Sequence, residues 1–424
     1  MTEARSNPET GGRRSRSWAR RVVGEVLLRW GARLGIGWIA LLTLVAILAP
    51  VLATSHPLLI QTADGTWSMP FLRYLTAADV TLFGLLALAL VFWRLPGRPW
   101  RRFGLWAVLG AVLAVVAWQT VSPPSLVIHE QYREAERMGE YQTVIRAPIP
   151  YSPRDYLRDY ADTGLEAPRE DPDRVHWFGT DDTGADVLSR MIHASRIALS
   201  IGFIATGIAL GIGVILGGLM GYFSGIVDMI GMRLVEIFEA IPTLFLLLTF
   251  VAFFGRSLYL MMLIIGLTSW SGYARYVRAE FLRLRQQDFV QGAIASGLSL
   301  PSILFRHMLP NGIAPILVAA SFGVASAILA EATLSFLGLG LVDDPSWGQM
   351  LNQAVQSSTF NWWMAAFPGG AIFLTVFAYN LIGEALRDAV DPHARSAART
   401  ANRDAGARPA AGAGASGATS GGVR

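Results

Sequence analysis

Long apolar runs recur along this 424-residue chain and limit what it can fold into. The hydrocarbon core of a bilayer is about 30 Å thick and a helix rises about 1.5 Å per residue, so a run of about 20 apolar residues can cross it. The sequence therefore predicts an all-α polytopic membrane protein. The predicted spans lie near residues 34–53, 79–95, 103–121, 197–222, 234–254, 257–274, 313–338 and 363–386.

The composition supports this prediction and excludes some functions. Only 16% of the residues are charged, whereas a soluble domain carries roughly a quarter. The chain has no cysteine, which excludes disulfides and thiolate metal sites. It also has no lysine, and a P-loop needs a lysine to reach the β- and γ-phosphates of ATP. Any ATP-driven step must therefore be carried by another chain.

The arginines form clusters beside the apolar runs. They lie near the N-terminus, at 98–102, at 275–306 and near the C-terminus. Arginines that flank spans remain on the cytoplasmic side of the membrane. This pattern places the N-terminus and the 275–312 segment in the cytoplasm, and it argues against a nucleic-acid-binding protein.

These features divide the chain into five regions. We expect the first span to be an uncleaved anchor, because it follows a basic tail and has full span length. The final region is rich in Ala, Gly, Arg and Ser, which predicts disorder. The regions are a basic cytoplasmic N-terminus at 1–33, the first span at 34–53, an outer loop with a transmembrane hairpin (79–121) at 54–174, a main transmembrane unit at 175–393, and a tail at 394–424.

The cytoplasmic segment 275–312 is too polar to enter lipid and too long to be a simple turn. Its apolar residues recur at helical spacing, and the pattern is broken at Gly297 and Pro301. Gly and Pro favour a bend, so we predict a helix–bend–helix element parallel to the membrane. Its central part, about residues 288–302, is called the coupling segment below. Such an element can lie in a groove of a cytoplasmic partner.

The same segment resembles the coupling loop of ABC importer permeases, which has an EAA motif, a glycine and a later Leu-Pro. Gln291 stands where that family has an acidic residue, and Gly292 stands where it has the first alanine. His307 followed by Met-Leu-Pro-Asn is similar to the peptide/nickel branch. The resemblance predicts an ATPase-coupling loop containing Asp288, Gln291, Gly292, Ala293, Gly297, His307, Leu309 and Pro310.

Further blocks in the same order resemble that branch across about 175–393. They are HWFGTDDTGADVLSR (176–190) and the segments 221–242, 331–351 and 367–392. Residues 56–70 are similar to the outer loop of the subgroup linked to microcin-C-like peptides. The resemblance implies a six-helix ABC permease core, from which the hairpin at 79–121 departs as an addition.

The resemblance also implies a function and partners. The chain is expected to be a multi-pass permease of the bacterial inner membrane, which moves peptides or peptide-like solutes and is not itself an enzyme. Expected partners are membrane lipid, a second permease subunit, two ABC ATPase subunits and an extracytoplasmic solute-binding protein. No cofactor is expected in this chain, since the ATPases would bind ATP and Mg²⁺. Oligopeptides, dipeptides, peptide antibiotics and nickel all remain open as solutes.

Acidic residues within the spans are candidates for a translocation path or gate, because burying an ionisable group in a membrane is costly. Glu236 and Glu239 lie three residues apart in the fifth span, and Glu331 lies deeper in the seventh. A structural alternative for the first two is a favourable position at a helix N-terminus. The alternative for Glu331 is a hydrogen bond to Ser326 or Thr333.

Two other patterns are interpreted as structural. Asp181, Asp182 and Asp186 precede the fourth span with a spacing unlike an EF-hand loop, so we predict a helix cap at Asp182 rather than a metal site. Glycines repeat at intervals of four in and just after that span, which favours close helix packing over substrate contact. They are Gly207, Gly211, Gly213, Gly217, Gly221 and Gly225.

The sequence lacks the features that two other classes of membrane protein require. A secondary transporter should contain broken helices and carboxylate pairs at matching places in two halves, and the sequence has no such repeat. A membrane-bound enzyme needs a clustered catalytic set, and the six scattered histidines provide none.

Overall fold

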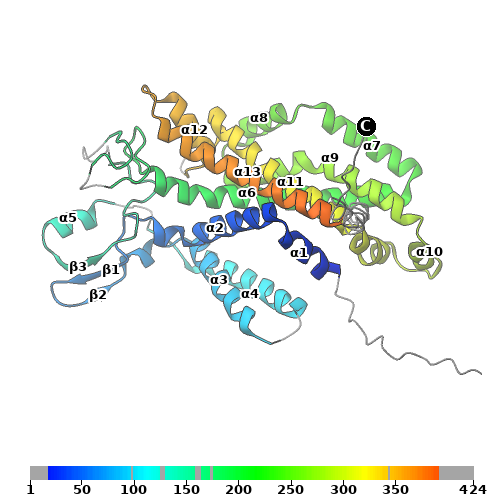
Figure 1. Cartoon of the computed structure of the whole chain (residues 1–424), viewed down its shortest axis with the longest axis horizontal. Coiled ribbons are helices and arrows are strands. Elements are labelled where there is room, and N and C mark those ends of the chain that lie inside the picture. Colours follow the sequence, from blue (N-terminus) through cyan, green and yellow to red (C-terminus); the bar gives the residue numbers. More distant parts are fainter. Residues whose placement is uncertain are drawn as a thin grey trace, which may run out of the picture.

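The fold is described from a computed structural model, which covers residues 18–96, 99–124, 129–157, 164–171, 175–341 and 344–390. The predicted tail at 394–424 and the first 17 residues lie outside these ranges. Long helices run side by side along an elongated molecule, with a small sheet at one end and the short helix α10 at the other (Figure 1).

Helices make up most of the described chain. The first group is α1 (Trp18–Leu28), α2 (Trp30–Leu52), α3 (Ala77–Arg94), α4 (Pro99–Thr120), α5 (Gln131–Arg137) and α6 (Val187–Phe223). The second group is α7 (Gly225–Ala240), α8 (Thr243–Phe254), α9 (Leu258–Arg285), α10 (Asp288–Ala295), α11 (Leu309–Leu334), α12 (Trp347–Gln356) and α13 (Trp362–Val390). A 3₁₀ turn η1 (Pro70–Tyr74) precedes α3, and the π-helical turns η3 (Ser302–Met308) and η4 (Ser335–Leu339) flank α11.

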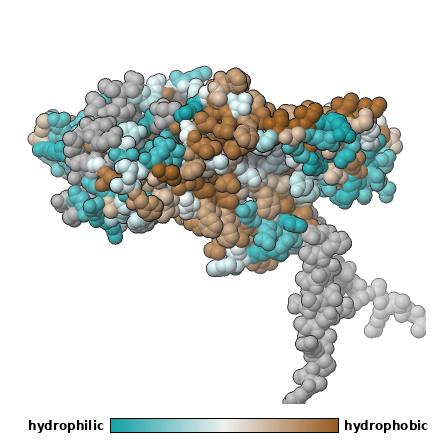
Figure 2. Space-filling view, turned by 90° about the horizontal axis from the view of Figure 1, so that it is seen from above, coloured by the Kyte–Doolittle hydropathy of each residue, from teal (hydrophilic) through white to brown (hydrophobic). Residues whose placement is uncertain are grey.

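Six of the described helices are long and apolar enough to cross a membrane, which confirms the all-α polytopic fold. They are α2, α3, α6 and α13, α4 from Arg101, and α11 with its two π-helical turns. Figure 2 shows hydrophobic residues across the middle of the visible face and hydrophilic residues toward both ends. The predicted range 257–274 falls in α9, whose later residues are more polar.

The prediction of one continuous span at 234–254 is wrong. α7 ends at Ala240, α8 begins at Thr243, and the two helices are bent by 80°. Pro242 explains the break, since a proline disfavours helical geometry in the residue before it. Ile241 accordingly has an extended backbone with ψ 122°. We call Ala240–Thr243 the α7–α8 elbow.

The close approach of α6 to α9 organises the bundle. A side-chain carbon added at Gly217 would lie 2.4 Å from the backbone oxygen of Ala274, and one at Gly213 would lie 2.5 Å from Cβ of Tyr273. Gly221 is equally close to α9. The predicted packing role therefore holds for these three glycines, whereas at Gly207 and Gly211 an added carbon would have no described atom within 4 Å.

On its other side, α6 packs in a buried layer with α2, α11 and α13. The layer is formed by small and branched residues, with Trp347 of α12 closing its outer end. The indole Nε1 of Trp347 donates to the backbone oxygen of Met191, 3.2 Å away. The buried layer also includes Leu42, Ala198, Ile328 and Ala371.

The predicted hairpin is present as α3 and α4, which project away from the bundle beside α2 (Figure 1). A polar junction attaches it to the bundle. Arg196 of α6 pairs with Asp79 in the first turn of α3 and also donates to the backbone oxygens of Ala46 and Ile47 in α2. The oxygen of Ala46 needs this donor because the residue four positions on, Pro50, has no N–H.

The outer region contains a three-stranded antiparallel sheet that was not predicted. Its order is β2 (Trp67–Ser68), β1 (Leu59–Thr62) and β3 (Tyr141–Ile145). Beside it, the ring of His56 stacks on Tyr74 at 3.6 Å. Burial, reinforced by the neighbouring His129, lowers the pKa of His56 to about 4, so the stacked imidazole is neutral at neutral pH.

The cap of α6 differs from the prediction. Asp186, and not Asp182, is the N-cap residue, and its carboxylate accepts from the backbone N–H of Ser189 at 2.7 Å. Asp181 instead pairs with Arg190. Among the residues that the structure describes, no group of three or more histidines and acids is arranged to hold a metal ion.

The α6–α9 contact yields a test of this architecture. We expect Gly217→Leu to lower the thermal unfolding midpoint of the purified protein in detergent, because overpacking a close contact costs about 1–3 kcal/mol. The matched control is Gly207→Leu on the same helix, where the added side chain has open space. Equal midpoints for both variants would contradict the assigned packing.

Candidate functional site

The coupling segment begins with α10, which follows α9 after a short turn. Val290 and Ala293, on one face of α10, are buried against Val277 and Phe281 of α9 and against Met308 of η3. The opposite face is exposed and includes Phe289. The segment is therefore fixed by one apolar face and leaves the other uncovered.

The predicted bend lies at Gly297, which has a φ of +70°. Its N–H donates to the oxygen of Ile294 at 2.9 Å, and the N–H of Leu298 donates to that of Ala293 at 3.3 Å. This pair of hydrogen bonds is a Schellman motif, which satisfies the last carbonyls of a helix and needs a left-handed residue. Glycine suits this position because it has no Cβ to clash.

Gln291 links α10 back to α9. Its Nε2 donates to the backbone oxygen of Arg285, the last residue of α9, at 2.7 Å. That carbonyl has no partner within its own helix, so the amide acts as a helix cap. A carboxylate cannot donate this hydrogen bond unless it is protonated. Glutamine in place of the acidic residue of the family pattern therefore allows this hydrogen bond between α10 and α9.

The other predicted residues of the loop occupy the two ends of the same element. Asp288 is the first residue of α10, where a negative charge interacts favourably with the helix dipole. The oxygen of Gly292 accepts from the backbone N–H and the hydroxyl of Ser296. The oxygen of His307 accepts from Asn311 at 2.7 Å. Leu309 and Pro310 begin α11.

Two arginines of α9 make contacts that sequence reasoning missed. Arg278 forms a two-pronged ion pair with Asp228 in the first turn of α7, with Nη2–Oδ2 at 2.6 Å. Arg285 donates to the hydroxyl of Ser224, between α6 and α7, at 2.6 Å. Their partners lie 50 and 61 residues away in sequence, so no local pattern could indicate these pairs.

Glu236 and Glu239 lie near the C-terminal end of α7, so the explanation by a helix N-terminus is wrong. Arginines neutralise them instead. Glu236 pairs with Arg233 one turn earlier, and Glu239 pairs with Arg275 of α9. Both carboxylates lie next to the α7–α8 elbow, and neither is fully buried.

Glu331 is buried in α11, with 2% of its surface exposed. Its carboxylate accepts from the hydroxyl of Ser335 at 2.6 Å. The alternative partners proposed from the sequence are wrong, since Ser326 and Thr333 both donate to backbone oxygens of their own helix. Within the part of the chain that the structure describes, Glu331 makes no hydrogen bond or ion pair with Glu236, Glu239 or their arginine partners.

Comparison with known proteins decides the family. Residues 213–396 match the family described as binding-protein-dependent transport system inner membrane component. A dipeptide transport system permease protein of Alkalihalophilus pseudofirmus is 39% identical over 56% of this chain and 78% of that protein. The chain belongs to this family of inner-membrane transport components. The prediction of a multi-pass inner-membrane transport subunit that is not itself an enzyme is confirmed.

Other relatives of this permease carry different solutes in their names. An oligopeptide transport system permease protein of Bacillus subtilis is 37% identical over 58% of this chain and 81% of that protein. A glutathione transport system permease protein of Pectobacterium atrosepticum is also 37% identical, over the same shares of the two chains.

The Gln291 cap of the permease can be tested directly. We expect Gln291→Glu to loosen the α9–α10 junction, because the donor is lost and a negative charge is placed beside a helix C-terminus. Loss of about 1 kcal/mol should raise hydrogen–deuterium exchange of the α10 amides about fivefold. Gln286→Glu is the control, since it changes charge equally at an exposed position. Unchanged exchange in Gln291→Glu would show that the cap is dispensable.

Proposed function

We propose that this permease forms part of the membrane pathway of an ABC importer for peptides or peptide-like solutes. The observation that carries this proposal is the coupling segment, a helix with one exposed face that is fixed by its other face to the end of α9. The relatives described above support peptides as the solute class, since they are permeases for dipeptides, oligopeptides and glutathione.

The exposed face of the coupling segment supports docking on an ATPase. Phe289, Ile294 and Leu298 are 36–42% exposed. An apolar patch outside lipid indicates contact with another protein. We assign that contact to a groove on an ABC ATPase subunit, which would bind ATP and Mg²⁺, because this chain has no lysine for a P-loop.

The proposed assembly contains a second permease subunit, two ATPase subunits and an extracytoplasmic solute-binding protein. Closure of the ATPases on ATP would displace α10. The apolar contacts of Val290 and Ala293, together with the Gln291 hydrogen bond, would pass this rigid-body motion to α9. Motion of α9 against α6 would alternate access to the two sides of the membrane.

We further propose that Glu236 and Glu239 line the translocation path. The α7–α8 elbow interrupts a helix pair that is otherwise apolar enough to span. Irregular backbone and charged pairs within a membrane are tolerated where they face protein or a water-filled cavity, not lipid. Glu331 has different contacts, and its burial beside Ser335 supports a gate that moves the end of α11.

The similarity of residues 56–70 to the outer loop of the subgroup linked to microcin-C-like peptides supports a narrower proposal, in which the solute is such a peptide. These residues form β1, β2 and the start of η1, on the same side of the molecule as α5 (Figure 1). Preferential uptake of a microcin-C-like peptide over an unmodified peptide of equal length would support this assignment, and equal uptake would count against it.

Uptake by the reconstituted complex tests the main proposal. We expect ATP-dependent peptide uptake that vanadate inhibits. Gly297→Val should reduce uptake at least tenfold while membrane insertion stays normal, because a β-branched residue is strained at a φ of +70°. Gly207→Val is the control, at an open position far from the segment. Full uptake by Gly297→Val, or uptake without an ATPase, would overturn the proposal.

The absence of cysteine from the sequence makes the path directly testable. In the assembled complex, a membrane-impermeant thiol reagent should modify Glu239→Cys and leave Val112→Cys unmodified. Val112 is an exposed apolar residue of α4, where lipid would cover the thiol. Protection of Glu239→Cys both with and without ATP would contradict its place in a water-filled path.

A further inference from the structure

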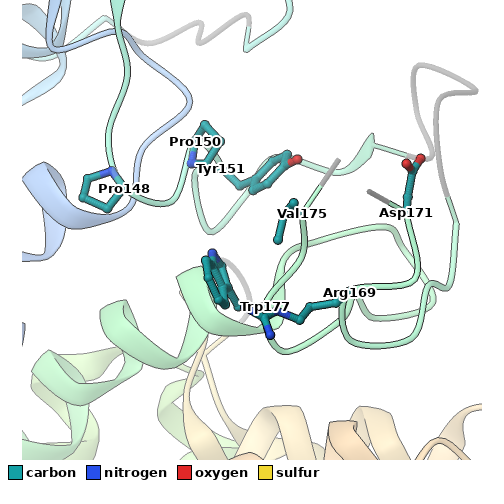
Figure 3. Close-up of a pocket in the computed structure, with 7 residues that line it drawn as sticks. All are labelled: Pro148, Pro150, Tyr151, Arg169, Asp171, Val175 and Trp177. Carbon is teal, nitrogen blue, oxygen red and sulfur yellow. The ribbon is translucent and has the colours of Figure 1, made fainter. Parts of the chain in front are cut away.

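The outer region contains a pocket of about 510 Å³ that none of the preceding functions uses. Small-molecule sites commonly have volumes of about 300–1,000 Å³ and combine apolar walls with a few polar groups. Figure 3 shows Pro150 and Tyr151 on one side of the pocket and Trp177 with Arg169 on the other. The other described residues that line it are Pro148, Asp171 and Val175.

The wall formed by Tyr151 is rigid. Its ring stacks on His176 at 4.2 Å, and its backbone oxygen accepts from the hydroxyl of Ser189 at 2.8 Å. His176 in turn is paired with Asp186, the N-cap residue of α6, at 2.8 Å. The pocket is therefore built directly onto the outer end of a core helix, and Tyr151 is only 7% exposed.

Arg169 supplies a positive charge at the opposite wall. Its guanidinium lies 4.2 Å from the ring centre of Trp177, an arrangement that orients the charged group. Its backbone has a φ of +60°, which is strained for an arginine. Retained strain of this kind marks a position where function is a reasonable hypothesis. Within the described residues, Arg169 forms no ion pair.

These features together define the class of ligand. A guanidinium binds carboxylates through two parallel hydrogen bonds, and aromatic and proline rings favour an apolar side chain beside the carboxylate. The C-terminal residue of a short peptide combines one carboxylate with one adjacent side chain.

We propose that this pocket is an outer binding site for the C-terminal end of a short peptide with an apolar last residue. Arg169 binds the terminal carboxylate, and Tyr151, Trp177 and Pro150 enclose the side chain. The choice of a peptide rests on the proposed function, whereas the requirement for a carboxylate rests on the pocket alone. Peptide held here would lie at the outer end of α6.

Binding to the full-length purified chain in nanodiscs tests the site without any transport step. The probes are the dipeptide Ala-Phe and its C-terminal amide, titrated while binding is measured by calorimetry. We expect the amide to bind at least tenfold more weakly, since it lacks the charge that Arg169 recognises. Arg169→Gln should weaken binding of the free acid by the same factor as amidation does, and should leave binding of the amide unchanged.

Arg73→Gln is the matched control, because it removes one positive charge from an exposed position of the same outer region. Trp177→Ala should weaken both probes, since it removes apolar contact. Equal affinity for acid and amide, or wild-type affinity in Arg169→Gln, would overturn the proposal. Peptide binding by a chain whose complex fails to transport peptides would refute the proposed function and leave this site standing.

Discussion

The permease depends on the close approach of α6 and α9 through Gly213, Gly217 and Gly221. Between two helices in lipid no hydrophobic effect draws them together, so their contact relies on close packing of backbone against backbone. Glycine allows this approach because any Cβ at Gly217 would overlap the carbonyl of Ala274. α6 is 37 residues long, about 55 Å at the usual rise, so it extends beyond the bilayer core. Ser189, near its N-terminal end, binds the pocket wall, and the C-terminal end of α9 leads into α10. A change in the α6–α9 contact would therefore displace both the pocket wall and α10.

At the C-terminal end of α9, polar contacts add to the close packing that the glycines allow. The ion pair of Arg278 with Asp228 and the hydrogen bond of Arg285 with Ser224 connect the end of α9 to the start of α7. The Gln291 cap and the apolar face of α10 connect the same helix end to the coupling segment. α10 and α7 are thus both attached to α9, but through different groups. A displacement of α10 would reach the α7–α8 elbow through α9 rather than through direct contact.

Much of this arrangement could be predicted from the sequence, and the failures have physical reasons. Hydropathy located the spans because lipid demands continuous apolar surface, and Gly297 marked the bend because few other residues adopt a positive φ. Averaged hydropathy does not register a change of direction, so the break at Pro242 was missed although the proline is visible. Because the span was assumed to begin near residue 234, Glu236 and Glu239 were assigned to a helix N-terminus, whereas they lie near the C-terminal end of α7. The arginine pairs join residues far apart in sequence, and the strands are too short to give a pattern.

The hairpin shows how an addition can be attached without disturbing a core. Only 6% of the spanning part of α3 and 11% of that of α4 is buried, so little apolar packing connects them to the bundle. The connection is polar instead. Pro50 leaves the oxygen of Ala46 without its helical donor, and Arg196 provides one while also pairing with Asp79. In a low-dielectric setting such a junction is strong and directional, whereas a lipid-facing apolar contact gains little over lipid itself. Arg196 therefore anchors the first turn of the hairpin to both α2 and α6.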